Sequence, residues 1–172
     1  MPEQFELCAL TTGPEITELL ATALAGCLVD GDVVSLNGDL GAGKTCFTKG
    51  LGRALGVTDP ITSPTFTLAT TYESPTRFNH LDVYRLAGPE EAHDLDIAGL
   101  SEDGVTVVEW GDRIGPELPH AVLRIELEYV DIDGGGVELD NHRRLTLCGT
   151  GSRWTERQSE IEGAIQPWAV AC

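Results

Sequence analysis

The 172-residue sequence contains little positive charge, with only two lysines, Lys44 and Lys49, and 11 basic residues in total against 28 acidic ones. The formal net charge is -17, and both halves of the chain, residues 1–86 and residues 87–172, are acidic. Because phosphate backbones attract basic surfaces, we expect bare DNA or RNA to repel this chain. Direct nucleic-acid binding is therefore disfavoured, and the placement of the two lysines five positions apart calls for an explanation.

Long apolar segments are also missing from the sequence. The longest charge-free apolar run extends from Leu19 to Val29, well short of the ~18 residues that cross a membrane. The N-terminal Met1-Pro-Glu3 has neither the basic start nor the apolar block that is typical of a signal peptide. We therefore expect a soluble, cytoplasmic chain of one domain with a hydrophobic core and no contact with membranes.

Cysteine and histidine occur without the spacing of a metal site. The closest cysteines are 19 positions apart, which excludes a CxxC zinc or redox pair, and the four histidines are equally scattered. We expect reduced, mostly buried thiols and no structural metal. The cysteines are Cys8, Cys27, Cys46, Cys148 and Cys172.

Helical and strand patterns alternate along the chain. Apolar residues, Leu19 among them, recur at helical spacing from Ile16 to Leu28 and predict an amphipathic helix. A short buried strand is expected over residues 33–36, followed by a Gly-rich turn and a second helix through Phe47. Further strands are expected over residues 66–72, 78–84, 105–108, 121–130 and 145–147, with residues 131–141 as a hairpin connection.

The clearest chemical signal is Gly38-Asp-Leu-Gly-Ala-Gly-Lys-Thr45, which matches the GxxxxGK[ST] phosphate loop. Its glycines permit a tight turn whose backbone N–H groups surround a β-phosphate, and the next helix adds its positive N-terminal end. Lys44 would bridge the β- and γ-phosphates, and the Thr45 hydroxyl would take one Mg²⁺ coordination position. One of the only two lysines, Lys44, thus occupies the phosphate-binding position of the motif. The residues predicted to bind the nucleotide phosphates are Gly38, Asp39, Leu40, Gly41, Ala42, Gly43, Lys44, Thr45 and Cys46.

These elements define the expected architecture. Strands separated by helices around a phosphate loop favour an α/β fold, namely a P-loop NTPase-type three-layer domain. We expect a central, mostly parallel sheet with an antiparallel hairpin extension over residues 1–150. Residues 151–172 are expected to form a C-terminal tail, in which the spacing of Trp154, Gln158, Ile161 and Ile165 indicates a short helix.

Two predicted strands end in a carboxylate, as a nucleotide-hydrolysing site requires. The apolar run before Glu109 favours this residue as the metal ligand beside Thr45. Asp82, at the end of the less apolar strand, is then expected to orient or deprotonate the attacking water. The Thr62-Ser-Pro-Thr65 segment lies where P-loop proteins place a switch loop, so a hydroxyl there is expected to sense the γ-phosphate.

Four motifs occur in order: the phosphate loop, Ser63-Pro-Thr-Phe-Thr67, His80-Leu-Asp-Val-Tyr-Arg85 and Val108-Glu-Trp110. Over about residues 8–130 they resemble the bacterial ATPase family of tRNA threonylcarbamoyladenosine biosynthesis, TsaE (formerly YjeE). Cys46 departs from this family, which often has Thr there, and it introduces a thiol that is open to oxidation.

The resemblance implies a compact ATPase that uses ATP and Mg²⁺, with the metal held by Thr45 and Glu109. It further implies that Asp82 is needed for hydrolysis, that Thr65 belongs to the switch-like loop and that Trp110 lies near the site. Thr12 would lie near the adenine end of the nucleotide.

The implied partners are TsaB and TsaD, a pair that transfers threonylcarbamoyl to the adenosine at position 37 of tRNAs that decode ANN codons. Contact with tRNA would be indirect, through these partners, and no contact with DNA is implied.

Three other interpretations remain open. A small-molecule P-loop kinase needs lid arginines, for which Arg143-Arg144 or the pair Arg153 and Arg157 are candidates. A switch GTPase is disfavoured, because neither lysine lies in an [NT]KxD motif. A non-catalytic nucleotide-binding regulator would not depend on the strand-end carboxylates.

Overall fold

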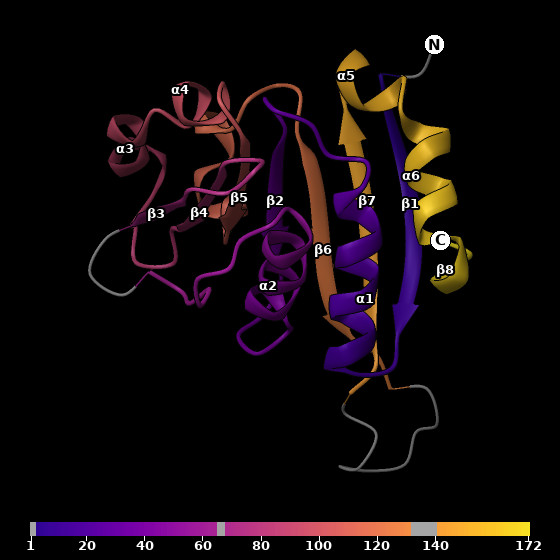
Figure 1. The fold of residues 1–172 in the computed structure, drawn as a ribbon. Coiled ribbons are helices and arrows are strands. Elements are labelled where there is room, and N and C mark those ends of the chain that lie inside the picture. The colour runs from indigo at the N-terminus through magenta and orange to yellow at the C-terminus, as the bar shows by residue number, and fades with distance from the viewer. Residues whose placement is uncertain (1–2, 65–67, 132–140) are drawn as a thin grey trace.

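The computed structural model describes residues 3–64, 68–131 and 141–172, which form an eight-stranded sheet with helices on both faces (Figure 1). The strands are β1 (Gln4–Thr11), β2 (Val33–Asn37), β3 (Ala69–Tyr72), β4 (Phe78–Asp82), β5 (Val105–Glu109), β6 (Leu123–Tyr129), β7 (Arg143–Thr150) and β8 (Ala169–Val170). The helices are α1 (Pro14–Ala25), α2 (Lys44–Ala54), α3 (Pro89–Ala92), α4 (Ile97–Ser101), α5 (Ser152–Thr155) and α6 (Gln158–Ile165). Short 3₁₀ turns are η1 (His93–Leu95), η2 (Gly111–Glu117) and η4 (Gln166–Trp168).

The strand order is β3-β4-β5-β2-β6-β7-β1-β8. The four central strands, β4, β5, β2 and β6, run parallel to one another, whereas the outer strands pair antiparallel. The predicted α/β fold with a P-loop-type parallel centre and an antiparallel β6–β7 extension is confirmed. The predicted connection over residues 131–141 lies almost wholly outside the described residues.

Side-chain alternation along β2 separates the two layers of the core. Val34 and Leu36 pack in one cluster with apolar side chains of α1, α2 and α6. Val33, on the opposite face, packs in a second cluster with residues of α3, α4 and η2. In Figure 1, α1 and α2 lie side by side in front of the sheet, and α3 and α4 lie toward its β3–β4 end. Parallel strands buried on both faces agree with the apolar runs of β2 and β5.

The helix predicted from Ile16 to Leu28 is α1, which ends at Ala25. Its buried face passes through Leu20 and Leu24, as predicted. The prediction is wrong for Leu19, which is 54% exposed, because buried Thr17 occupies the core-facing position in that turn instead.

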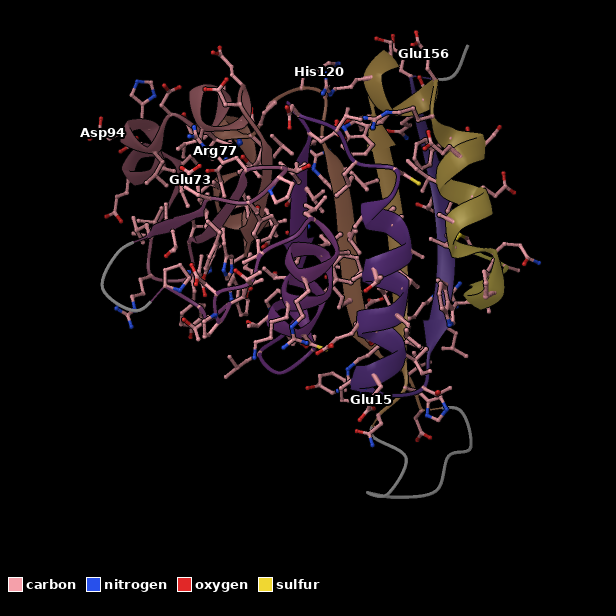
Figure 2. All side chains as sticks on the ribbon, in the orientation of Figure 1. Glu15, Glu73, Arg77, Asp94, His120 and Glu156 are labelled. Atoms are coloured by element: carbon pink, nitrogen blue, oxygen red, sulfur yellow. A yellow bond between two sulfur atoms is a disulfide. The ribbon has the colours of Figure 1, made fainter. Side chains whose placement is uncertain are left out.

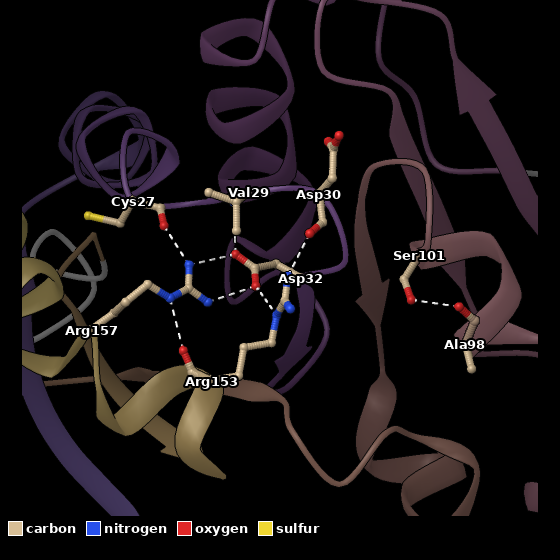
Figure 3. A network of polar contacts seen from close by, with 8 residues as sticks. All are labelled: Cys27, Val29, Asp30, Asp32, Ala98, Ser101, Arg153 and Arg157. Atoms are coloured by element: carbon tan, nitrogen blue, oxygen red, sulfur yellow. Dashed lines mark hydrogen bonds and ion pairs between the residues drawn. The ribbon is translucent and has the colours of Figure 1, made fainter.

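The C-terminal segment packs on the sheet through apolar and charged side chains. Trp154 and Ile161 are fully buried in the same cluster as α1 and α2. Asp32, which precedes β2 and is fully buried, accepts hydrogen bonds from Arg153 Nε (2.7 Å) and from Arg157 Nη2 (2.7 Å) (Figure 3). The expected domain boundary at residue 150 stays a prediction, although the residues beyond it contribute to the core.

The last strand closes the far edge of the sheet, where β8 pairs with β1. Next to this pairing, Cys8 and Cys172 form a disulfide, whereas Cys27, Cys46 and Cys148 are free. The expectation of reduced thiols is therefore wrong for the first and last cysteines, which the antiparallel return of the chain brings together.

Acidic side chains project from separate parts of the surface. Glu15, Glu73, Asp94 and Glu156 are all exposed and come from different elements or loops (Figure 2). Within the described parts of the chain, no helix combines the length and apolarity needed to cross a membrane.

Candidate nucleotide-binding site

The phosphate loop connects the end of β2 with the first residue of α2, Lys44. Gly38, Gly41 and Gly43 have φ angles of +133°, +79° and +109°, in the region that favours glycine. A Cβ at Gly38 would overlap the backbone carbonyl oxygen of Leu127 in β6. The loop conformation therefore depends on glycine, as the motif requires.

The Lys44 side chain folds back over this loop. Its Nζ donates to the carbonyl oxygens of Gly38 (2.6 Å) and Asp39 (2.9 Å) and lies 3.7 Å from the centre of the Trp110 ring. The residue is only 5% exposed, and this burial lowers the pKa of its ammonium group. Trp110 follows β5 with a φ of +63°, so the chain turns sharply there and carries its ring beside the lysine.

Thr45, the next residue, faces the end of β5. Its hydroxyl donates to Glu109 Oε2 over 3.0 Å and lies 3.1 Å from the hydroxyl oxygen of Ser63. A threonine hydroxyl from α2, a carboxylate from β5 and a serine hydroxyl from the predicted switch segment thus meet at one point.

The Glu109 carboxylate is only 2% exposed and is held by further donors. Thr48 donates to Oε1 over 3.0 Å, and His80 Nε2 lies 2.8 Å from the same oxygen. Because an ionised carboxylate only accepts, the buried His80 ring donates from Nε2. Burial and three donors fix the orientation of this carboxylate.

Asp82 lies beside Glu109, because β4 and β5 are parallel and these two residues pair in register. Its Oδ1 accepts a hydrogen bond from the backbone N–H of Tyr84 over 3.0 Å. Burial raises the pKa of the Asp82 carboxyl, and the negative charge of Glu109 raises it further. A hollow of about 220 Å³ is lined by both carboxylates together with Lys44, Thr45, Cys46, Ser63, Trp110 and the adjoining loop residues Leu40, Gly41 and Gly43.

A second hollow of about 190 Å³ adjoins the other side of the loop. Its lining includes Gly13, Thr17, Asn141 and Arg143. Thr12 is exposed in the turn before α1, directly next to the lining residue Gly13 but not itself part of the lining.

Cys46 lines both hollows. Its thiol donates to the carbonyl oxygen of Pro14 over 3.3 Å, and burial raises its pKa to about 11. The thiol is therefore almost entirely protonated at neutral pH, which makes it a weak nucleophile.

The structure brings the side chains of Lys44, Thr45, Asp82 and Glu109 to one hollow, as predicted, and the predicted residues Leu40, Cys46 and Trp110 also line it. Thr65, the predicted switch residue, lies outside the described residues, and Ser63 from the same segment contacts Thr45 instead.

The predicted site did not include Thr48 or His80, although both hold Glu109. Their spacing was a usable signal, because Thr48 follows Thr45 by three positions on a helix and His80 lies two positions before Asp82 on a strand.

The fold and the loop define the class: this is a P-loop NTPase-type protein, with its candidate nucleotide-binding site at the carboxyl ends of its parallel strands. The family model described as "Threonylcarbamoyl adenosine biosynthesis protein TsaE" matches residues 11–135. The chain belongs to the TsaE family.

Relatives from several bacteria agree with this assignment. A tRNA threonylcarbamoyladenosine biosynthesis protein TsaE of Treponema pallidum is 42% identical over 131 residues, covering 74% of this chain and 89% of its own length. The Streptomyces coelicolor protein of the same name is 42% identical over 139 residues, covering 78% and 91%. The crystal structure of Bacillus subtilis YdiB superposes with a TM-score of 0.72 at 32% identity and covers 95% of this chain and 98% of that one.

Proposed function

We propose that this protein is a Mg²⁺-dependent ATPase that supports a TsaB–TsaD pair in forming N6-threonylcarbamoyladenosine at position 37 of tRNAs that decode ANN codons. The observation that carries the proposal is the 3.0 Å contact between the Thr45 hydroxyl and the Glu109 carboxylate. It lies in the hollow that Lys44 and Asp82 also line. Family membership and the names of the relatives support the biosynthetic part of the proposal.

The donor set fits magnesium. The Thr45 hydroxyl lies within hydrogen-bond distance of both the Ser63 hydroxyl and the Glu109 carboxylate, and Mg²⁺ prefers such hard oxygen ligands. Thr45 and Glu109 would hold the ion, and Mg²⁺ when bound neutralises charge on the β- and γ-phosphate oxygens. Thr48 and His80 would keep the Glu109 carboxylate aimed at it.

The other side chains of the hollow would bind the phosphates, hold the attacking water and exclude solvent. Lys44 would exchange its two loop carbonyl acceptors for phosphate oxygens, since its ammonium is already at the loop. Asp82 would hold the attacking water, and its raised pKa brings it closer to the range in which a carboxylate accepts a proton efficiently. Trp110 packs against Lys44 and would exclude solvent from the lysine side of the hollow.

The charge of the molecule favours an indirect relation to tRNA. At a net charge of -17 the surface repels phosphate, so basic partners would hold the tRNA while this chain supplies the nucleotide cycle. A cytoplasmic location, where tRNA is modified, belongs to the same proposal.

Three of the four arginines that suggested the kinase interpretation bind groups away from the phosphate loop, whereas Arg143 lies at the loop and lines its second hollow. Arg153 and Arg157 bind Asp32 just before the start of β2 (Figure 3), whereas the phosphate loop follows the opposite end of that strand. Arg144 donates to the carbonyl oxygens of Ala171 and Cys172, near the edge of the sheet.

Reconstitution tests the proposal. Threonylcarbamoyladenosine formation is measured with TsaB, TsaD, tRNA, MgATP and either the wild-type chain or Lys44→Ala. Lys49→Ala is the matched control, because it removes the other lysine of the same helix without touching the lining of the hollow. We expect modification to be lost in Lys44→Ala and retained in Lys49→Ala; equal modification with Lys44→Ala and wild type would refute the proposal.

A further inference from the structure

The end of the β6–β7 hairpin lies against the phosphate loop. Tyr129 and Arg143 pair directly across the two strands at the last position of the register. The Arg143 guanidinium lies 3.8 Å from the centre of the Tyr129 ring, within the range of a cation–π contact. The two side chains thus form one unit at the hairpin end, which we call the Tyr129–Arg143 pair.

This pair donates hydrogen bonds to three consecutive carbonyl oxygens of the loop. Arg143 Nε donates to Ala42 O over 3.0 Å, and its Nη2 lies 3.5 Å from Gly41 O. The Tyr129 hydroxyl donates to Leu40 O over 3.4 Å. Lys44 already binds the two preceding carbonyls, so every carbonyl from residue 38 to residue 42 has a donor.

The direction of these carbonyls sets the direction of the amides. In a trans peptide the N–H of one residue points opposite to the carbonyl of the residue before it. Holding the carbonyls of Leu40 and Ala42 toward the hairpin therefore turns the N–H groups of Gly41 and Gly43 away from it. An anion-binding loop needs such N–H groups turned inward and its carbonyl oxygens turned outward.

Glycine at position 41 permits this arrangement. A Cβ there would lie 2.8 Å from the Tyr129 hydroxyl, and the φ of +79° already disfavours a side chain. The positive charge of Arg143 also offsets the negative ends of the carbonyl dipoles, which would otherwise repel a phosphate. The absence of a side chain at Gly41 thus leaves room for Tyr129, and the charge of Arg143 suits the carbonyl oxygens of the loop.

We infer that Tyr129 and Arg143 are positioning residues that hold the phosphate loop in its anion-binding conformation. The inference rests on the proposed nucleotide site and adds two residues to it. Both act on the backbone of the loop and neither needs to touch the reacting phosphate.

The test compares Arg143→Ala with Arg144→Ala. The control removes the same charge from the neighbouring position of β7, where Arg144 donates instead to the carbonyl oxygens of Ala171 and Cys172. The first readout is hydrogen exchange of the Ala42 amide in nucleotide-free protein, since this N–H donates to Asp39 O within the loop over 3.0 Å. The second is the dissociation constant of MgADP, measured by calorimetry.

Arg143→Ala is expected to speed exchange of the Ala42 amide about tenfold and to weaken MgADP binding about tenfold, whereas Arg144→Ala leaves both at wild-type values. Arg143→Met, which keeps an apolar stem against the Tyr129 ring, gives the same result should the alanine variant not fold.

Wild-type exchange of the Ala42 amide in the Arg143 variants would overturn the inference, whether or not nucleotide binds. Failure of the wild-type protein to bind MgADP would instead refute the proposed function and leave the exchange comparison to decide the positioning role.

Discussion

Replacing Arg157 with alanine is predicted to destabilise the protein without altering its nucleotide site. The side chain is 19% exposed, and its guanidinium donates to both oxygens of Asp32, at 2.9 and 2.7 Å. It also donates to the Cys27 carbonyl oxygen over 2.8 Å and lies 4.5 Å from the centre of the Trp154 ring. The pKa of Arg157 is raised, first by its hydrogen bonds to Asp32, so the guanidinium stays protonated.

The magnitude follows from the burial of Asp32. Removing one partner of a buried ion pair costs about 3–5 kcal/mol, because the remaining charge has lost its compensation. Arg153 Nε and the backbone N–H of Val29 continue to bind Asp32 in the variant, which places the expected loss near the lower end, about 3 kcal/mol. For a chain of this size, 1 kcal/mol corresponds to about 2–4 °C, so the melting temperature should fall by about 6–12 °C.

Thermal unfolding followed by circular dichroism measures this loss. Arg77→Ala is the matched control, because Arg77 pairs with Glu73 at the surface, where both side chains are well exposed. An exposed pair contributes less than about 1 kcal/mol, so the control should melt within about 3 °C of wild type. MgADP affinity should be unchanged in Arg157→Ala, since Asp32 lies at the other end of β2 from the loop. A melting temperature of Arg157→Ala equal to that of the control would refute the reasoning.

Three further results are expected. Thr48→Val, which removes one donor to Glu109 at nearly constant volume, should lower MgATP hydrolysis about tenfold; an unchanged rate would show that this donor does not position the carboxylate. Cys46, with a pKa of about 11, should be alkylated by iodoacetamide far more slowly at pH 8 than at pH 10, because its thiolate fraction falls about tenfold for each pH unit below the pKa. Equal rates at the two pH values would contradict the assigned pKa. Reducing the disulfide between Cys8 and Cys172 should lower the free energy of unfolding by about 2–4 kcal/mol in urea titrations and raise the count of titratable thiols from three to five; unchanged stability after reduction would contradict a structural role.

Local patterns sufficed for the parts of the site that depend on local geometry. The glycines before Lys44 identify the phosphate loop from the sequence alone. The carboxyl ends of parallel strands lie at one edge of a sheet. Two strand-end carboxylates were therefore expected to lie close together, and Asp82 and Glu109 do pair in register. Their roles as water-positioning group and metal ligand stay predictions.

Features that depend on distant partners were not predicted. The strand β1 was missed because its identity rests on pairing with β7, which lies far along the chain. From the sequence, Arg153 and Arg157 were candidate lid arginines, whereas in the structure both donate hydrogen bonds to Asp32. A sequence gives no measure of which of its many carboxylates will be buried beside a given arginine.

The side chains that support the site were missed for a related reason. The spacing of Thr48 from Thr45 and of His80 from Asp82 placed both residues on the faces that line the site, but their role depends on both reaching the same oxygen of Glu109. Leu19 illustrates the opposite error, because apolar residues occur on more than one face of α1 and spacing alone did not choose between them.

The central claim is that Glu109 and its neighbours form a metal-dependent hydrolytic site. The most direct measurement is the rate of MgATP hydrolysis in the presence of TsaB and TsaD, compared between wild type and Glu109→Gln. Glu117→Gln, which changes a carboxylate that contacts His93 outside the hollow, is the control. We predict a loss of at least about 100-fold in Glu109→Gln and none in the control, with all three proteins folded. Hydrolysis by Glu109→Gln at the wild-type rate would contradict the account.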